Sequence, residues 1–228
     1  MLQVGKSAAS SGLLQDFLCK ASIAQKFGGN ANLYYSQNGL KGHPGVDLSQ
    51  GYDRSITASH DGLVYKILNK DNPDLSKYRA VCVLFDEDGF SYELTYGHCD
   101  EIYARLGSTV SAGDLLASMG NTGDVYSGGL PVPVQERLSP GHRGTHLHWQ
   151  LRKCVRTQST QAGKQYLQAQ DGGTYNDGSY YEVVDFENGY NGTIDPLPYL
   201  YSLSGWSKLP YYVRLVSQLA AVYKGRNL

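Results

Sequence analysis

The chain has 228 residues, a formal net charge of −1, 41% hydrophobic residues and 18% charged residues. These values exclude a disordered chain and fit a globular protein that buries a core of its own. Lys and Arg form no cluster, which disfavours a nucleic-acid partner because phosphate binding needs grouped cations. The 27 glycines and 19 tyrosines favour a turn-rich β protein with a polar groove.

The first element expected from the sequence is a helix over about 11–26. Its apolar residues follow helical spacing, and it ends before Gly28-Gly29, a pair that stops helices. Gln15 and Asp16 interrupt its apolar cluster, so the segment makes a poor signal-peptide core. No stretch of the sequence is long and apolar enough to cross a membrane as a helix.

Short strands follow this helical segment. An acidic turn ending in Gly89 joins two of them and predicts a hairpin. The alternation of apolar and polar residues, or a short apolar run between turn residues, marks the others. Strands are predicted over 62–68, 80–85, 90–96, 147–151 and, in two short pieces, within 110–119.

The segment 124–143 is rich in Gly and Pro, and we expect a long loop of functional importance there. Beyond it, the extension 156–228 is predicted to be irregular with one or two strands, and to close in an amphipathic helix over 209–223. We therefore expect an all-β fold with an antiparallel β-sheet core and peripheral N- and C-terminal helices. It would form a single domain over 1–228, with its core at about 27–155.

The four cysteines are Cys19, Cys82, Cys99 and Cys154. They show no C-x-x-C spacing, which argues against a cysteine-based zinc site, and their disulfide state stays open. Cys99 follows His98 directly, but adjacent residues on a strand point to opposite faces. A catalytic pair of these two residues is therefore disfavoured, and a core or free thiol is the simpler interpretation.

Two pairs of potential metal ligands stand out among the six histidines. His43 and Asp47 flank a Pro-Gly bend, and His146 and His148 lie two apart on a predicted strand, so they share a face. Imidazole and carboxylate groups suit zinc, and a catalytic zinc takes three protein ligands. Either pair alone is weak evidence, because an isolated surface or core histidine is more common.

Five short motifs occur in a fixed order over about 27–151. They are Gly-His-x-Gly-Val-Asp, Asp-Gly-x-Val, Tyr-x-His, Gly-Asn-Thr-Gly and His-Leu-His-Trp. Together they resemble the lysostaphin-like, LytM-type zinc metallopeptidases, which cut peptide bonds in bacterial peptidoglycan. The resemblance implies a zinc ion bound by His43, Asp47 and His148, with His98 and His146 as catalytic histidines that do not bind the metal.

The resemblance also implies a mechanism of amide hydrolysis. Zinc would activate a water, His146 would accept its proton, and His98 would donate to the developing oxyanion or orient the water. No H-E-x-x-H helix is present. A tyrosine is expected near the metal, and the spacing does not decide between Tyr34 and Tyr35.

Three further residues are candidates of lower rank. His142 and Arg143 stand in the 124–143 loop, which is longer than the family's usual linker. We expect both to be solvated loop residues. His60 precedes a turn, and a structural role is expected for it.

The expected partner is the peptide part of peptidoglycan, in a stem or a cross-bridge. Two alternatives stay open: a catalytically silent module that binds the cell wall or regulates an amidase, and a wall-cutting component of a virion tail. With no clear signal peptide in this chain, we expect an extracellular, periplasmic or virion-associated protein that depends on a virion or secretion partner.

Overall fold

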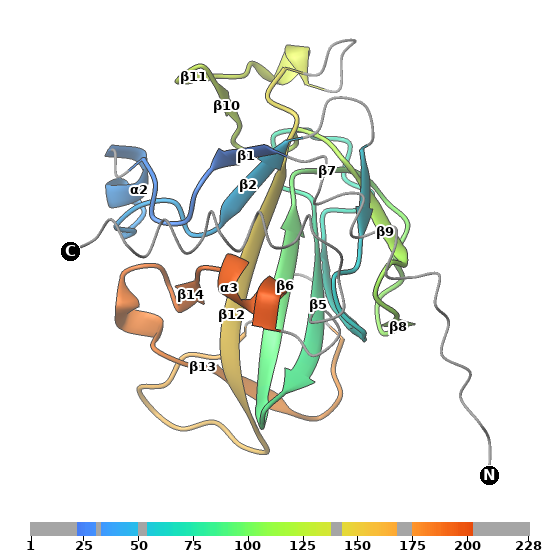
Figure 1. Ribbon diagram of the computed structural model, residues 1–228, viewed down its shortest axis with the longest axis vertical. Helices are drawn as coiled ribbons and strands as arrows, with labels where there is room; N and C mark the ends of the chain where they lie inside the picture. Colours follow the sequence, from blue (N-terminus) through green and yellow to red (C-terminus); the bar gives the residue numbers. More distant parts are fainter. Residues whose placement is uncertain (1–21, 31–32, 50–53, 138–142, 168–174, 203–228) are drawn as a thin grey trace. The chain divides into compact units, whose positions relative to one another are not determined.

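The computed structural model describes residues 22–30, 33–49, 54–137, 143–167 and 175–202 (Figure 1). The chain divides into two compact units, 1–195 and 196–228. The described part of the second unit contains the short helix α3 (Leu197–Ser202). All β-strands among the described residues lie in the first unit. The predicted boundaries of the core and its extensions stay predictions.

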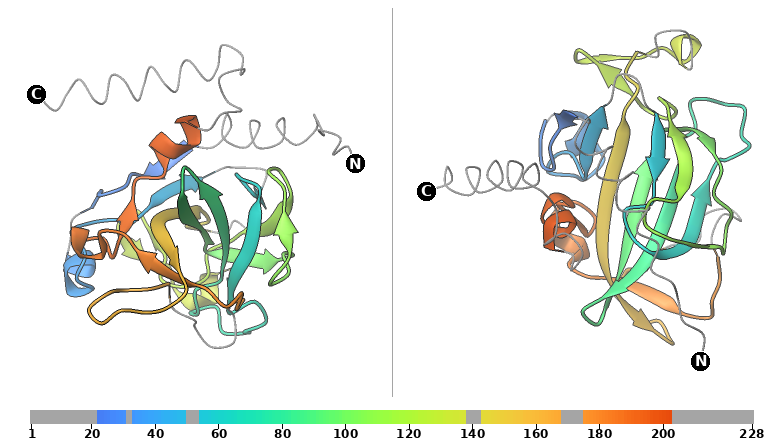
Figure 2. Two further views of the ribbon diagram at one scale, coloured as in Figure 1. Left: turned by 90° about the horizontal axis from the view of Figure 1, so that it is seen from below. Right: turned by 45° about the vertical axis from the view of Figure 1, so that its right-hand side comes forward.

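The larger sheet of the first unit is antiparallel and has nine strands (Figure 2). Its central path is β1 (Ser22–Gln25), β2 (Val46–Ser49), β12 (Leu147–Thr157), β6 (Phe90–Gly97), β5 (Ala80–Glu87), β4 (Gly62–Leu68) and β8 (Thr109–Val110). Two further strands pair with β12, namely β13 (Tyr180–Val183) and β14 (Thr193–Ile194).

The remaining elements are small. A three-stranded sheet contains β3 (Ser55–Thr57), β9 (Leu115–Met119) and β7 (Cys99–Ile102), and a separate hairpin contains β10 (Tyr126–Ser127) and β11 (Leu130–Pro131). The helical elements of the first unit are α2 (Leu33–Gln37) and the 3-10 turns η1 (Val134–Glu136) and η2 (Phe186–Asn188). Among the described residues, no helix has the length and hydrophobicity needed to cross a membrane.

The all-β fold class and the predicted central strands are confirmed. Strands β4, β5, β6 and β12 cover the ranges expected from the sequence, and β12 continues beyond the predicted end to Thr157. The acidic turn between β5 and β6 is a hairpin, in which Asp88 and Gly89 have φ angles of 49° and 77°. Such positive φ angles suit glycine and, less often, aspartate, so the turn chemistry explains the hairpin.

The predicted helix over about 11–26 is wrong in its last part. Ser22–Gln25 form strand β1, with Ile23 opposite Leu48 and Gln25 opposite Asp47 on β2. Pairing with β2 gives the backbone N–H and C=O groups of both strands hydrogen-bond partners. This stabilisation comes from a distant segment, so the helical spacing of nearby residues does not reveal it. Residues 11–21 of this prediction, and the predicted closing helix over 209–223, lie outside the described residues.

The segment expected as a long loop carries some regular structure. Its described part, 124–137, contains the β10–β11 hairpin and the η1 turn. The hairpin turns through Gly128 and Gly129, whose φ angles of 60° and 80° are accessible to glycine at little cost. The remainder, 138–142, lies outside the described residues.

The two faces of the larger sheet differ in chemistry. One face is apolar and carries fully buried residues such as Val83, Leu94 and Leu151. From this face, the Tyr96 hydroxyl accepts a hydrogen bond of 2.9 Å from the backbone N–H of Ser59, which follows β3. The apolar face therefore forms the core beneath the smaller sheet.

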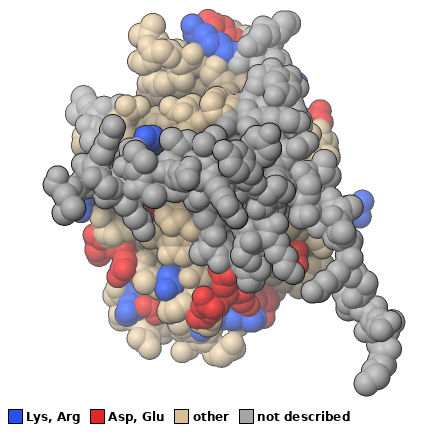
Figure 3. All heavy atoms as spheres, in the orientation of Figure 1, with Lys and Arg blue, Asp and Glu red and all other residues tan. Residues whose placement is uncertain are grey.

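The opposite face of the same strands carries a group of polar side chains along part of its length. On β12 it carries His148, Gln150 and Arg152, and the facing positions on β6 are Gly97, Thr95 and Glu93. We call these six positions the polar face. On the visible surface of the molecule, both signs of charge are interspersed (Figure 3). The grouping of polar side chains on this internal face is therefore the feature that directs attention to a functional site.

Candidate metal centre

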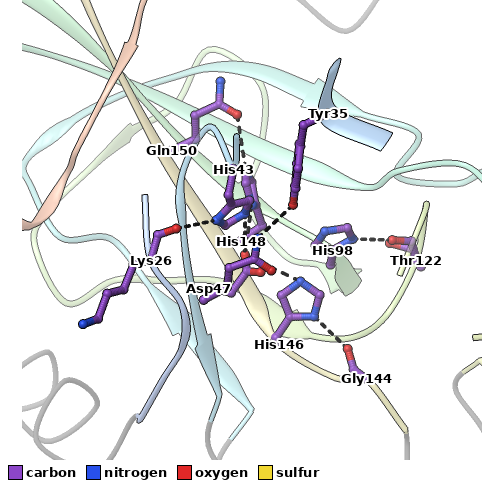
Figure 4. A network of polar contacts seen from close by, with 11 residues as sticks. Lys26, Tyr35, His43, Asp47, His98, Thr122, Gly144, His146, His148 and Gln150 are labelled. Carbon is purple, nitrogen blue, oxygen red and sulfur yellow. Dashed lines mark hydrogen bonds and ion pairs between the residues drawn. The ribbon is translucent and has the colours of Figure 1, made fainter. Parts of the chain in front are cut away.

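Three side chains converge at one end of the polar face (Figure 4). His43 Nε2 lies 2.9 Å from His148 Nδ1 and 3.1 Å from Asp47 Oδ1, and the third distance, between His148 Nδ1 and Asp47 Oδ1, is 3.0 Å. All three residues are buried. We call this arrangement the ligand triangle.

The outer nitrogens of both rings are held by hydrogen-bond acceptors. His43 Nδ1 lies 3.2 Å from the Lys26 carbonyl oxygen, and His148 Nε2 lies 3.3 Å from Gln150 Oε1. A neutral imidazole that donates through one nitrogen keeps a lone pair on the other. With those outer protons in place, each ring would turn a lone pair into the triangle, which is the tautomer that metal binding needs.

Asp47 supplies the negative charge of the triangle. Burial alone would raise its pKa, but the adjoining imidazoles of His148 and His43 more than offset this and hold the pKa of Asp47 well below its usual range. The carboxylate is therefore ionised. Two ring nitrogens and an ionised carboxylate that converge in this way form a ligand set that fits a divalent cation.

The spacing of the triangle also fits zinc. Ligand atoms at zinc bond lengths of about 2.0–2.1 Å in a tetrahedron lie about 3.4 Å apart. The observed distances of 2.9–3.1 Å are a few tenths of an ångström shorter, so a small outward shift would accommodate the ion.

Two glycines shape the segment that carries His43 and Asp47. A Cβ on Gly42 would lie 2.6 Å from the Gly28 carbonyl oxygen. A Cβ on Gly45 would lie 2.7 Å from the Trp149 carbonyl oxygen and 2.8 Å from the His148 ring. Only the absence of side chains lets this segment pack against β12 and bring the triangle together.

The remaining two histidines of the resemblance lie beside the triangle. His146 Nδ1 is 2.7 Å from the Gly144 carbonyl oxygen, and its Nε2 is 3.7 Å from Asp47 Oδ1. The ring of His98 lies 4.4 Å from that of His146, measured between centroids. The structure thus brings all five histidine and aspartate candidates into one cluster.

The Gly-Asn-Thr-Gly motif holds His98 in place. The carbonyl oxygen of Thr122 lies 2.6 Å from His98 Nδ1, while the Thr122 hydroxyl donates to the Cys99 carbonyl oxygen. His98 has a φ of 60°, an uncommon backbone conformation for a non-glycine residue. Burial, and then the neighbouring His146, keeps the pKa of His98 well below its usual value; burial also lowers the pKa of His146.

The structure distinguishes between the two tyrosine candidates. Tyr35 lies against the triangle, with its ring 5.9 Å from that of His43, whereas Tyr34 packs against Tyr126 at 5.7 Å. The hydroxyl of Tyr35 accepts a hydrogen bond of 2.9 Å from Gln25 Nε2. Burial raises the pKa of Tyr35 to about 12, so its hydroxyl stays protonated at neutral pH.

A cleft of about 430 Å³ opens beside the triangle. Asp47 and His146 reach its wall, together with Tyr34 and Tyr35. The β10–β11 hairpin contributes Tyr126 and its glycine turn. The long segment noted in the sequence is therefore part of the cleft wall.

The lower-ranked candidates lie apart from the triangle. His60 stacks on Phe85 with ring centroids 4.1 Å apart, and Arg143 forms a 3.0 Å ion pair with Glu136. His142 lies outside the described residues. Neither His60 nor Arg143 belongs to the cleft wall formed by the described residues.

The described cysteines are free and buried. Burial raises the pKa of Cys99 and of Cys82 to about 12 in each case, which keeps both thiols protonated. A thiol in this state is a poor nucleophile, in agreement with the interpretation of Cys99 as a core residue. Cys19 lies outside the described residues.

Sequence reasoning missed the acceptors that orient the rings. Gln150 lies two residues beyond His148 on the same strand, so strand periodicity could have identified it as a neighbour. The Lys26 carbonyl and the Thr122 carbonyl are backbone groups, and no residue type in the sequence marks them.

The sequence profile of peptidase family M23 matches residues 41–164, which is more than half of the chain. The chain belongs to peptidase family M23. The M23 match contains the whole triangle and both neighbouring histidines, so the resemblance drawn from the motifs is confirmed at the level of the family.

Solved structures similar to this M23 protein include LytU, which is 28% identical over 49% of this chain and 62% of that chain, with a TM-score of 0.35. The catalytic domain of the antimicrobial peptidase lysostaphin from Staphylococcus simulans is 17% identical over 85% of this chain and 98% of that chain, with a TM-score of 0.43. The catalytic domain of the prophage-encoded M23 protein EnpA from Enterococcus faecalis is 21% identical over 58% and 81%, with a TM-score of 0.37. No protein among those with curated functions matches the sequence.

Proposed function

We propose that this M23 protein is a zinc metalloendopeptidase that hydrolyses peptide bonds in bacterial peptidoglycan. The observation that carries the proposal is the ligand triangle, in which two ring nitrogens and one carboxylate converge beside a cleft. Membership of peptidase family M23 supports the reaction class. The motif resemblance to lysostaphin-like enzymes supports the substrate.

His43, Asp47 and His148 would hold the metal. A zinc ion bound there would polarise the scissile carbonyl and lower the pKa of a water toward neutrality. Gln150 and the Lys26 carbonyl would fix the two rings in the tautomers that metal binding needs.

His146 is suited to accept the proton of the attacking water. Its Nδ1–H donates to the Gly144 carbonyl, which leaves the Nε2 lone pair beside Asp47. Because burial lowers its pKa, the ring is neutral and ready to accept at neutral pH. The protonated ring would then return that proton to the leaving amine nitrogen.

The geometry favours a different role for His98 than donation to the oxyanion. Its Nδ1–H is directed at the Thr122 carbonyl, and its lowered pKa keeps the ring neutral, so Nε2 is an acceptor. His98 is therefore suited to orienting the water. Tyr35, which lines the cleft and keeps its hydroxyl proton, is the better donor to a developing oxyanion.

The cleft suits an uncharged peptide segment. Among the described residues of its wall, Asp47 is the one with a formally charged side chain, and the rest are tyrosines, small residues and neutral polar groups. Such a wall recognises backbone amides through hydrogen bonds and aromatic contacts. A peptidoglycan substrate implies that the protein acts in an extracellular, periplasmic or virion-associated setting.

The test combines metal analysis with digestion of purified sacculi and mass spectrometry of the released fragments. We expect about one zinc per chain, peptide release that stops on chelation and resumes when zinc is restored, and fragments that identify the bond. Bound zinc without any release from sacculi would reject the endopeptidase and favour a silent wall-binding module.

A further inference from the structure

A second cavity lies at the other end of the polar face and has a volume of about 230 Å³. Lys66, Glu93 and Arg152 from strands β4, β6 and β12 contribute its charged side chains. The rest of its wall comes from residues that follow the M23-matched range: Gln165, Tyr166, Leu167, Val183, Phe186 and Asn191. This cavity, which we call the charged pocket, is thus built partly by the chain's own C-terminal extension.

Glu93 is the most deeply buried member of the charged pocket, with 1% of its surface exposed. Its Oε1 accepts a 2.9 Å hydrogen bond from Arg152 Nη1, but its Oε2 is buried and has no hydrogen-bond partner in the described structure. A buried carboxylate oxygen without a donor is costly, because it has lost water and gained nothing in return. The pocket therefore needs a hydrogen-bond donor at this oxygen.

Lys66 presents the complementary need. It is 8% exposed, lines the pocket, and forms no ion pair with any residue that the structure describes. An ammonium that lines a partly enclosed pocket without an ion-pair partner is a favourable contact for an acceptor or an anion. Lys66 and Arg152 together against Glu93 leave one excess positive charge, so the pocket needs an acceptor as well as a donor.

The volume and the walls narrow the choice of ligand further. A water occupies roughly 30 Å³ in the liquid, so 230 Å³ exceeds the space that one bridging water fills. Leu167, Val183 and Phe186 also line the pocket and offer apolar contact. A simple anion would leave Glu93 Oε2 without a donor, and a simple cation would leave Lys66 without an acceptor.

We propose that the charged pocket binds a small zwitterion of the amino-acid type. The ammonium group of the ligand meets Glu93 Oε2, and its carboxylate meets Lys66 and Arg152. Its apolar side chain packs on Leu167 and Phe186. This binding is separate from the metal centre and does not depend on the proposed peptidase activity.

The ligand chemistry is tested with three matched probes on the full chain, by titration calorimetry and by chemical-shift changes in NMR spectra. The probes are leucine in both enantiomers, 4-methylpentanoate, which lacks the ammonium, and 3-methylbutylamine, which lacks the carboxylate. We expect leucine to bind, and each single-charge probe to bind about tenfold more weakly or worse. The proposal fails if 4-methylpentanoate binds as tightly as leucine, or if leucine does not bind at all.

Two variants locate the binding site. Lys66→Met and Glu93→Gln should each weaken leucine binding about tenfold or more, whereas Lys153→Met, on the opposite face of β12, should leave it unchanged. If Glu93→Gln does not fold, Lys66→Met and the three probes still test whether the charged pocket binds leucine. Unchanged leucine affinity in folded Lys66→Met would overturn the assignment.

A metal-site variant keeps this inference distinct from the proposed function. His43→Ala should lose zinc and still bind leucine as the unmodified chain does. If the unmodified chain binds leucine but releases no peptide from sacculi, the peptidase proposal alone is rejected. If the unmodified chain is active but does not bind leucine, the charged pocket alone is rejected.

Discussion

The two ends of the polar face make opposite demands on what binds there. At the triangle end, His43, Asp47 and His148 bring two ring nitrogens and a carboxylate oxygen within 3.1 Å of one another, a set of ligand atoms that suits a cation. At the other end, Glu93 has an ion-pair partner and an unpartnered oxygen, and it shares a cavity with Lys66. The two ends differ in which atoms lack a hydrogen-bond partner. Burial of polar side chains therefore identifies a binding site, and the kind of ligand, only when each such atom is named.

The largest effect is expected from removing one corner of the triangle. His43→Ala takes away a ring nitrogen that the Lys26 carbonyl holds in place. We expect bound zinc to fall to near zero and release of peptides from sacculi to fall about 10⁴-fold or more, because the metal chemistry is lost. Metal analysis and initial rates measure both. His60→Ala, which removes a buried imidazole elsewhere, should keep zinc and activity; a similar loss in that control would contradict the assignment.

A smaller effect is expected beside the triangle. His146→Ala should lower kcat by about 10²–10⁴-fold while zinc content stays that of the unmodified chain, since a general base contributes to the rate and not to metal binding. The pair of measurements separates His146 from the ligands. Loss of zinc in this variant would mean that His146 binds the metal.

A third prediction concerns a buried imidazole that belongs to neither end. Burial lowers the pKa of His60 to about 4, below the ordinary value of 6.5. As pH falls from 6.5 to 4, the unfolded chain takes up a proton at this ring and the folded chain does not, so stability is lost over that window. The difference between the pKa values of His60 in the unfolded and folded chain corresponds to a loss of at most about 3 kcal/mol in the free energy of unfolding.

The check is denaturant unfolding from pH 7 to pH 4. His60→Phe keeps the aromatic stack on Phe85 and removes the titrating group. Its free energy of unfolding should fall less steeply between pH 6.5 and 4 than that of the unmodified chain. Parallel pH profiles for the two proteins would show that His60 is not the source.

The smallest effect is expected midway along the polar face. Gln150→Leu removes the acceptor at His148 Nε2, and we expect zinc affinity to fall about 10–100-fold. Gln150→Glu restores an acceptor and should recover most of that affinity. Competition with a chromogenic chelator measures both, and equal affinity in all three proteins would remove Gln150 from the metal centre.

Sequence reasoning reached the central strands because their patterns are local. The acidic turn before Phe90 predicts its hairpin, and two-residue spacing puts His146 and His148 on one face. It failed at Ser22–Gln25, where pairing with β2 overrides the helical spacing. That pairing is a contact between distant segments, and local sequence carries no record of it.

The sequence predicted the ligand and catalytic residues of the candidate site, but not the hydrogen-bond acceptors that orient them. Motif order brought the five ligand and catalytic candidates together, whereas the carbonyls that orient their rings are backbone atoms with no sequence signature. The charged pocket was not predictable, because it depends on the register that sets Arg152 opposite Glu93. A shift of one residue in the register of β12 would turn Arg152 to the other face, away from Glu93.

Gly45 has a consequence for which metal ions the triangle accepts. Because a Cβ at Gly45 would lie 2.8 Å from the His148 ring and 2.7 Å from the Trp149 carbonyl oxygen, the space between this segment and β12 is too narrow for a side chain there. A main-chain segment packed this closely against a strand should resist widening, so we expect the triangle to select ions by radius as well as by ligand type. An ion with bonds of about 2.0–2.1 Å fits the triangle, and one that needs 2.3–2.6 Å, as calcium does, would have to push two strands apart.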